Sequence, residues 1–275
     1  MTEIINLAEG IGDDHVYAEA AKIASKKLKN DYSFIIQVWK HEMPEETRYP
    51  KVLISTSDEA HNIPKQIHDD SFVHIFKQYA PLTTENMLDI QAAGKVTAIP
   101  LCHLQGVYNK NIPIKERDHD WSWMGKFDPY TRSHFRGCVA RLSYSRPDYK
   151  SKVLWYDGWG NGEDLGSYSD IMNSTKIAPA PVGSSSVESF RFFEAMMCGC
   201  VVLNTSLPPT DFYNSAPYIK LDDWHQLTEV VDFLLADLDT MEELSNKAKE
   251  WYKNFCSPEA ISELIVSKLE GENEN

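Results

Sequence analysis

Apolar, β-rich runs alternate with helical patterns along almost the whole chain. A helix between two strands carries the chain back to the edge where it started, so this alternation is typical of parallel sheets. We therefore predict an α/β fold with helices on both faces of its sheets. The predicted strands are Ile4–Ala8, Phe34–Trp39, Lys51–Thr56, Phe72–Lys77, Val96–Leu101, Trp121–Lys126, Lys152–Asp157, Lys176–Val182, Cys200–Asn204 and Tyr218–Leu221.

The same pattern divides the chain into two Rossmann-like domains. Residues 1–115 form the first, residues 116–255 the second, and residues 256–275 a helix that returns to the first domain and a disordered tail. A looser stretch from Tyr108 to Asp120, which contains Pro113, is expected to link them. The predicted helices are Val16–Leu28, Thr84–Ala93, Pro129–Ser145, one near Val187, Gln226–Ala236, Glu242–Phe255 and Pro258–Leu269.

Charge and composition limit the possible partners. A net charge of −14 and a pI near 5.1 disfavour nucleic acid and anionic membranes, whose binding needs clustered Lys and Arg. No apolar run approaches the roughly 20 residues that span a bilayer, and no signal peptide is recognisable. Five cysteines among apolar neighbours indicate a reducing compartment. These features favour a cytoplasmic protein of unknown oligomeric state.

One segment combines a loop, a helix and a strand in immediate succession. It runs from Pro181 and Gly183 through Ser184, Ser185, Ser186 and Ser189 to Arg191, Glu194 and Gly199-Cys-Val-Val-Leu. Ser185 and Glu188 fit a capping box. A loop that opens a helix presents free amides and the positive end of the helix dipole, which is how α/β proteins hold phosphate. A solvated surface helix is the alternative.

A second strand–loop–helix segment has similar chemistry. In Trp123-Met-Gly-Lys-Phe-Asp-Pro-Tyr-Thr-Arg, a strand leads through Gly125 and Lys126 to Arg132 at the start of a helix. Two cations and two helix N-termini could offset the charge of a leaving diphosphate without a metal. Aromatic residues beside these segments are candidates for stacking on a sugar or base, and they include Trp155, Tyr156 and Trp159. The alternative is that they pack in the core, as most such residues do.

The order Pro-x-Gly, serines, Ser189-x-Arg191-x-x-Glu194-Ala, Gly199-Cys-Val-Val and Pro208-Pro209 resembles the donor-binding half of exostosin-like glycosyltransferases. The resemblance covers about Lys152 to Trp224 best. It implies a two-domain GT-B fold, a nucleotide-sugar donor, a glycan acceptor and inversion at the anomeric carbon. Arg191 would contact the diphosphate and Glu194 the ribose or sugar. Met196 stands eight residues after Glu188, so the Glu-x7-Glu pattern of retaining GT-B enzymes does not start there.

The base that activates the acceptor is expected in the first domain, at the carboxyl end of a strand. Asp14 and His15 follow the first strand, and Asp58 follows the third. A closed, desolvated cleft would bring the pKa of such a group towards neutrality. The alternative is that Asp13 or Asp14 only caps the following helix.

No metal or other cofactor is expected beyond the UDP-sugar. Asp118-His-Asp120 and Asp237-Leu-Asp239 mimic a metal-binding Asp-x-Asp motif, but neither ends an apolar strand. His61, His68 and His74 lack helical i,i+4 spacing.

Together these features predict an inverting, metal-independent glycosyltransferase that moves a sugar, with xylose as the best guess, from a UDP-sugar to a glycan hydroxyl. Its size and the missing anchor favour a microbial source or a large algal virus. A non-catalytic sugar-binding protein and a DNA-modifying transferase are the alternatives.

Overall fold

The computed structural model describes residues 2–10, 12–38, 42–44, 46–59, 61–62, 64–79, 94–158 and 161–271. The chain forms two compact units. Unit 1 consists of Met1–Gln105 with Asn254–Asn275, and unit 2 of Gly106–Lys253. Five-stranded parallel sheets form the centre of each unit.

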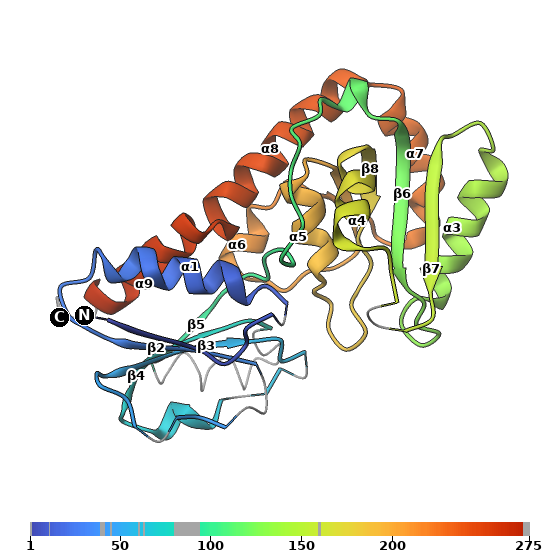
Figure 1. Ribbon diagram of the computed structural model, residues 1–275. Coiled ribbons are helices and arrows are strands. Elements are labelled where there is room, and N and C mark those ends of the chain that lie inside the picture. The colour runs from blue at the N-terminus through green and yellow to red at the C-terminus, as the bar shows by residue number, and fades with distance from the viewer. Residues whose placement is uncertain are drawn as a thin grey trace. The chain divides into compact units, whose positions relative to one another are not determined.

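The sheet of unit 1 follows the chain order β1-β2-β3-β4-β5. The N-terminal helix α1 and the C-terminal helix α9 pack side by side on it (Figure 1). An ion pair 2.6 Å long joins Lys27, which follows α1, to Glu263 of α9. The elements are β1 Glu3–Asn6, α1 Asp14–Ser25, β2 Ser33–Val38, β3 Lys51–Thr56, η1 Lys65–His68, β4 Phe72–Lys77, β5 Val96–Ala98 and α9 Pro258–Gly271.

The sheet of unit 2 has the order β10-β9-β8-β6-β7. From β6 the chain passes to β7 on one side, and then to β8 on the other. The elements are η2 Ile114–Glu116, β6 His119–Lys126, α3 Ser133–Ser145, β7 Ser151–Tyr156, α4 Leu165–Asn173, β8 Thr175–Pro179, α5 Phe190–Met197, β9 Val201–Asn204, α6 Asp211–Asn214, β10 Ile219–Lys220, η3 Trp224–Gln226, α7 Leu227–Leu235 and α8 Leu238–Cys256.

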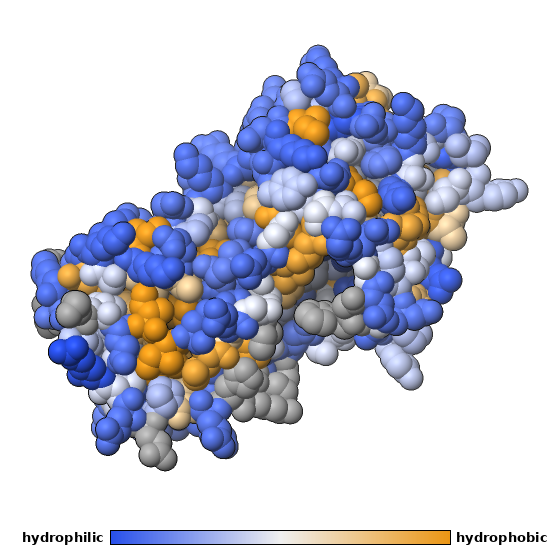
Figure 2. All heavy atoms as spheres, viewed as in Figure 1, coloured by the Kyte–Doolittle hydropathy of each residue, from blue (hydrophilic) through white to orange (hydrophobic). Residues whose placement is uncertain are grey.

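The core of unit 2 lies between β6 and the helices α3 and α7. Trp121 and Trp123 of β6 are fully buried there, and Phe135 of α3 packs edge-on against Trp123 with ring centroids 4.8 Å apart. The face seen in Figure 2 is mostly hydrophilic, with apolar side chains gathered over the strands of unit 1. Within the described ranges, no helix combines the length and the apolar character that crossing a bilayer requires.

Every predicted strand is present; β3 and β4 have the predicted ends, and the ends of the other strands differ by up to three residues. The predicted helix Thr84–Ala93 lies outside the described residues. Helices α4 and α6 were not predicted, although Asp164 gives a signal for α4: its carboxylate caps that helix by accepting from the amides of Gly166 and Ser167, both at 3.0 Å.

The stretch expected to be a loose link is docked onto unit 2. The Arg117 guanidinium is buried and donates to the carbonyl oxygens of Thr175, at 2.7 Å, and Cys198, at 2.8 Å. The amide of Asn109 donates to the Met197 carbonyl at 2.7 Å. Backbone carbonyls at the ends of helices lack partners within the helix, so a buried arginine that bonds several carbonyls fixes this segment.

Gly199 provides a test of the packing at the end of α5. Its φ is +69°, and an added Cβ would lie 2.8 Å from the Ser245 hydroxyl. We expect Gly199→Ala to lower the free energy of unfolding by about 1–2 kcal/mol, because an L-residue is strained in this region. The matched control is Gly137→Ala in α3, where nothing lies within 4 Å of the new methyl. It should be neutral or stabilise by about 0.5–1 kcal/mol. Urea unfolding of both variants measures the contrast, and equal effects would contradict it.

Candidate functional site

The strand order of unit 2 identifies one place for a ligand. In open α/β sheets, ligands bind at the carboxyl ends of the strands where the chain reverses its direction across the sheet. That point lies between β6 and β8. Strand β6 ends with Gly125 and Lys126 and leads into one loop, and the loop after β8 contains Gly183. The two loops singled out in the sequence therefore meet at this edge.

Arg191 of α5 lies against the end of β6. Its guanidinium carbon is 4.1 Å from the centroid of the Trp123 ring, and its Nη2 donates to the Met124 carbonyl. A Cβ on Gly125 would come within 2.6 Å of Nη2 and 3.0 Å of the Trp123 ring. A side chain at position 125 would thus displace the arginine, and glycine is what allows it to stack on the tryptophan.

The Gly183 loop is closed tightly on itself. A Cβ on Gly183 would lie 2.6 Å from the Glu188 carbonyl oxygen and 3.1 Å from that of Ser186. Inside the loop, the Ser186 hydroxyl accepts from the Glu188 amide at 3.1 Å. Ser184 and Ser185 remain exposed. Any other residue at 183 would require the backbone to move, so the loop holds its exposed serines in one arrangement.

The predicted capping box of Ser185 and Glu188 is wrong. Helix α5 starts at Phe190 with Ser189 as N-cap, and no side chain caps it. The Ser189 hydroxyl donates instead to the Pro181 carbonyl at 3.4 Å, and Glu188 accepts from the Tyr213 hydroxyl at 2.7 Å. The serines therefore shape a loop ahead of the helix, and the first amides of α5 are left without a side-chain cap.

The spacing of Phe190, Phe193 and Met197 predicts that these three residues share one apolar face of the helix, and the structure differs from this prediction. Phe192, Phe193 and Met196 are fully buried, whereas Phe190 and Met197 are half-buried. Phe192 packs against Tyr213 and Trp251, with ring centroids 5.8 Å apart in both pairs, so the helix turns this face towards those rings.

Arg132 connects the two loops through hydrogen bonds to their backbones. It is 6% exposed, and it donates through Nε to the Val182 carbonyl and through Nη1 to the Lys126 carbonyl, both at 2.9 Å. Its guanidinium also lies 5.4 Å from the Trp123 ring centroid. Arg132 thus fixes both loop backbones relative to each other, a positioning role that the sequence did not indicate.

Glu194 and Tyr156 complete the surroundings of Arg191. Glu194 is buried and accepts from the Tyr168 hydroxyl at 2.7 Å. Tyr156, at the end of β7, pairs in register with Lys126 at the end of β6. Burial raises the pKa of Tyr156, and the Arg191 charge opposes that rise. The same opposition acts on the buried Tyr168. Arg191 is therefore close enough to both hydroxyls to affect their pKa values. Trp159 lies outside the described residues.

The three candidate bases of unit 1 have different surroundings. Asp58 forms a buried ion pair with Lys77 at 3.0 Å and accepts two bonds from Asn62 at 2.9 Å. Asp14 is buried and accepts from the Asn6 amide at 2.8 Å. His15 is half-buried, and its Nε2 lies 3.3 Å from Nε2 of His103. Burial lowers the pKa of His15, while Asp14 opposes the shift.

Asp13 is an unusual group that the sequence suggested only as a helix cap. Its side chain does not cap α1 but accepts from the Cys102 amide at 2.8 Å and the Gln78 side chain at 2.7 Å. Complete burial raises its pKa to about 7, and these bonds oppose the rise. The carboxyl group is thus held inside unit 1, where its neutral form is favoured.

Asp13 should make stability depend on pH. The pKa of Asp13 is about 7 in the folded chain and has the ordinary value of 3.8 in the unfolded chain. Between pH 3.8 and 7, the folded chain therefore holds a proton that the unfolded chain has released. The free energy of unfolding should therefore fall as pH rises through this window, by at most about 1.4 kcal/mol per pH unit. Asp13→Asn should lack this slope, and the exposed Asp70→Asn should retain it. Urea unfolding across the window tests this, and equal slopes in wild type and Asp13→Asn would contradict it.

Known proteins resemble this chain in structure. No protein-family model and no curated protein matches its sequence. Anabaena HepE, solved in complex with UDP, aligns with a TM-score of 0.51 and 10% identity over 92% of this chain and 82% of that one. TarM aligns with a TM-score of 0.53 and 12% identity over 92% of this chain and 58% of that one. The accessory secretory protein 1, 2 and 3 structure from Streptococcus pneumoniae gives 0.55 and 8% identity, over 98% and 63%.

These likenesses define the class of fold. Two units, each with a five-stranded parallel sheet, and the C-terminal helices match the GT-B architecture of glycosyltransferases. The predicted GT-B fold is confirmed.

Proposed function

We propose that this chain is an inverting glycosyltransferase that transfers a sugar from a UDP-sugar to a hydroxyl group of a glycan. The observation that carries the proposal is the position of Arg191, stacked on Trp123 at the strand-order reversal and beside the Gly183 loop. The GT-B fold and the UDP bound to HepE support a nucleotide donor. The exostosin-like resemblance supports inversion and a glycan acceptor.

Arg191 would bind the diphosphate. Its Nη2 is occupied by the Met124 carbonyl, but its Nε is buried and, among the residues that the structure describes, has no hydrogen-bond partner. A buried donor without a partner costs free energy, which a phosphate oxygen would recover through a charge-assisted bond. The exposed hydroxyls of Ser184 and Ser185 and the first amides of α5 would add donors to the departing group.

Glu194 would bind the ribose or the sugar, as the resemblance implies. Tyr168 fixes one oxygen of its carboxylate. Lys126 and Tyr156, at adjacent strand ends, would line the donor. We propose that no metal takes part in the transfer, because fixed cations can stabilise the leaving group. Xylose is the proposed sugar, on the basis of the substrates of the resembled family.

His15 is the strongest of the three candidates for the base. Asp58 is neutralised by Lys77, and Asp14 is buried and bonded to Asn6. His15 is partly accessible, and burial lowers its pKa so that the neutral ring, which can accept a proton, prevails at neutral pH.

Replacing Arg191 tests the diphosphate assignment. Arg191→Ala should weaken UDP binding by about 10- to 100-fold, as expected for the loss of a charge-assisted hydrogen bond. Gly125→Ala should weaken it too, because the new methyl displaces the guanidinium. Arg141→Ala, an exposed arginine on α3, is the control and should bind as wild type does. Calorimetry with UDP measures all four proteins. Unchanged UDP affinity in Arg191→Ala would refute the assignment.

His15→Asn tests the base. We expect kcat to fall by about 10²- to 10⁴-fold while UDP binding stays unchanged, because a general base acts on the acceptor and not on the donor. In wild type, kcat/KM should fall only below pH 6.5, the ordinary pKa of histidine. Burial lowers the pKa of His15, so its ring stays neutral at and above that pH. The assay measures product from a panel of UDP-sugars. A His15→Asn variant with the wild-type rate and pH profile would exclude His15 as the base. If the wild-type protein bound UDP but transferred sugar to no acceptor, that result would favour a non-catalytic binding protein.

A further inference from the structure

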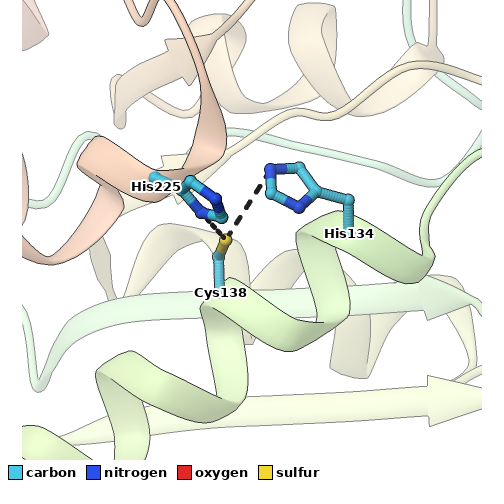
Figure 3. Close-up of side chains that lie close together, drawn as sticks. All are labelled: His134, Cys138 and His225. Carbon is cyan, nitrogen blue, oxygen red and sulfur yellow. Dashed lines mark hydrogen bonds between the residues drawn. The ribbon is translucent and has the colours of Figure 1, made fainter.

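Three side chains that bind metals in many proteins converge on the outer side of α3 in unit 2. His134 and Cys138 lie one turn apart on α3, and His225 approaches from η3 (Figure 3). The Cys138 sulfur is 3.4 Å from Nδ1 of His225 and 4.0 Å from Nε2 of His134. All three donor atoms lie within 4.8 Å of one another.

These distances are close to those of a tetrahedral zinc site. Zinc bond lengths of about 2.3 Å to sulfur and 2.0–2.1 Å to nitrogen place sulfur and nitrogen ligands about 3.6 Å apart and two nitrogens about 3.4 Å apart. The Cys138–His225 separation already fits, and small side-chain rotations of His134 would complete the set.

Asp223 supplies a fourth donor on the same side. Its Oδ1 lies 3.0 Å from Nε2 of His134 and 3.6 Å from Nδ1 of His225, the two nitrogens that face the thiol. That oxygen also accepts from the His225 amide at 2.7 Å, which fixes the position of the carboxylate. The carboxylate thus lies beside both imidazole nitrogens of the cluster.

The closest hydrogen bonds pair His134 with Asp223 and Cys138 with His225, yet both imidazole nitrogens lie within 4.0 Å of the sulfur. A thiol has one proton, so Cys138 can donate to one imidazole and not to both. The two ring nitrogens nevertheless approach the sulfur from different elements, α3 and η3. The sulfur is buried, with Cys138 4% exposed, whereas the side chains of His134 and His225 are 47% and 60% exposed. A cation could therefore enter from solvent and meet a fixed sulfur.

We propose that His134 Nε2, Cys138 Sγ and His225 Nδ1 bind a divalent cation of the zinc type, with the Asp223 carboxylate as the fourth ligand. Imidazole and thiolate ligands suit zinc rather than magnesium or calcium. Binding forms the metal–sulfur bond and releases the thiol proton to solvent. With four protein ligands the site is closed and structural, and it ties α3 to η3. The inference is independent of the proposed transferase activity.

Titration of chelator-treated protein with zinc chloride tests the site. Calorimetry should show one saturable site, and saturating zinc should raise the melting temperature, because a metal that binds only the folded chain stabilises it. Cobalt(II) in place of zinc should give a sulfur-to-metal charge-transfer band and the visible bands of a tetrahedral complex.

Four variants locate the ligands. Cys138→Ser should abolish the charge-transfer band, and His134→Gln and His225→Gln should remove the zinc-dependent rise in melting temperature. Both histidines are exposed, so these two variants leave the core intact. Asp223→Asn should weaken zinc binding by about 10- to 100-fold. His68→Gln, an exposed histidine of unit 1, is the matched control and should behave as wild type does.

Two results would overturn the proposal. One is wild-type protein that shows neither saturable zinc binding nor a shift in melting temperature. The other is zinc binding that survives unchanged in both histidine variants, which would place the cation elsewhere on the chain.

Discussion

The stacking of Arg191 on Trp123 is the interaction on which the candidate donor site depends. Trp123 is a core residue of β6, so the site and the core of unit 2 share one side chain. The arginine reaches that ring only because position 125 has no side chain. Arg132 holds the Lys126 carbonyl, at the end of β6, and the Val182 carbonyl, after β8. A guanidinium is weakly hydrated and planar, which suits it to such a half-buried position on an aromatic face.

Much of the fold could be predicted from the sequence, because buried parallel strands are continuous apolar runs between turn residues. The run Lys51–Thr56 was predicted with the ends that the structure gives. Short helices were harder. The four-residue α6 is too short for a helical period to emerge. Strand order could not be predicted, since it depends on long-range pairing, yet it decides that the ligand edge lies between β6 and β8.

The site was predictable at the level of loops but not of contacts. Glycines and serines mark the loop at Gly183, whereas the capping box failed because Ser186 bonds the Glu188 amide before the helix begins. Asp13 looked like an ordinary cap, and only the tertiary fold shows that its carboxyl is enclosed by Gln78 and Cys102. The i,i+4 pair of His134 and Cys138 on α3 has a spacing typical of metal ligands, but His225 lies 87 residues after Cys138, so only the tertiary fold brings the three together.

Helix α3 links the two sites of unit 2. Arg132 stands at its N-cap and fixes the loops after β6 and β8, and two residues later His134 begins the proposed cation site. A helix held at its first turn by a buried guanidinium and by the proposed cation retains little freedom to move. Such restraint keeps the Lys126 carbonyl, and with it the end of β6, in place beneath Arg191. Preorganised donors stabilise developing charge because they need not rearrange as it forms, so rigidity at α3 serves the chemistry proposed for the loops.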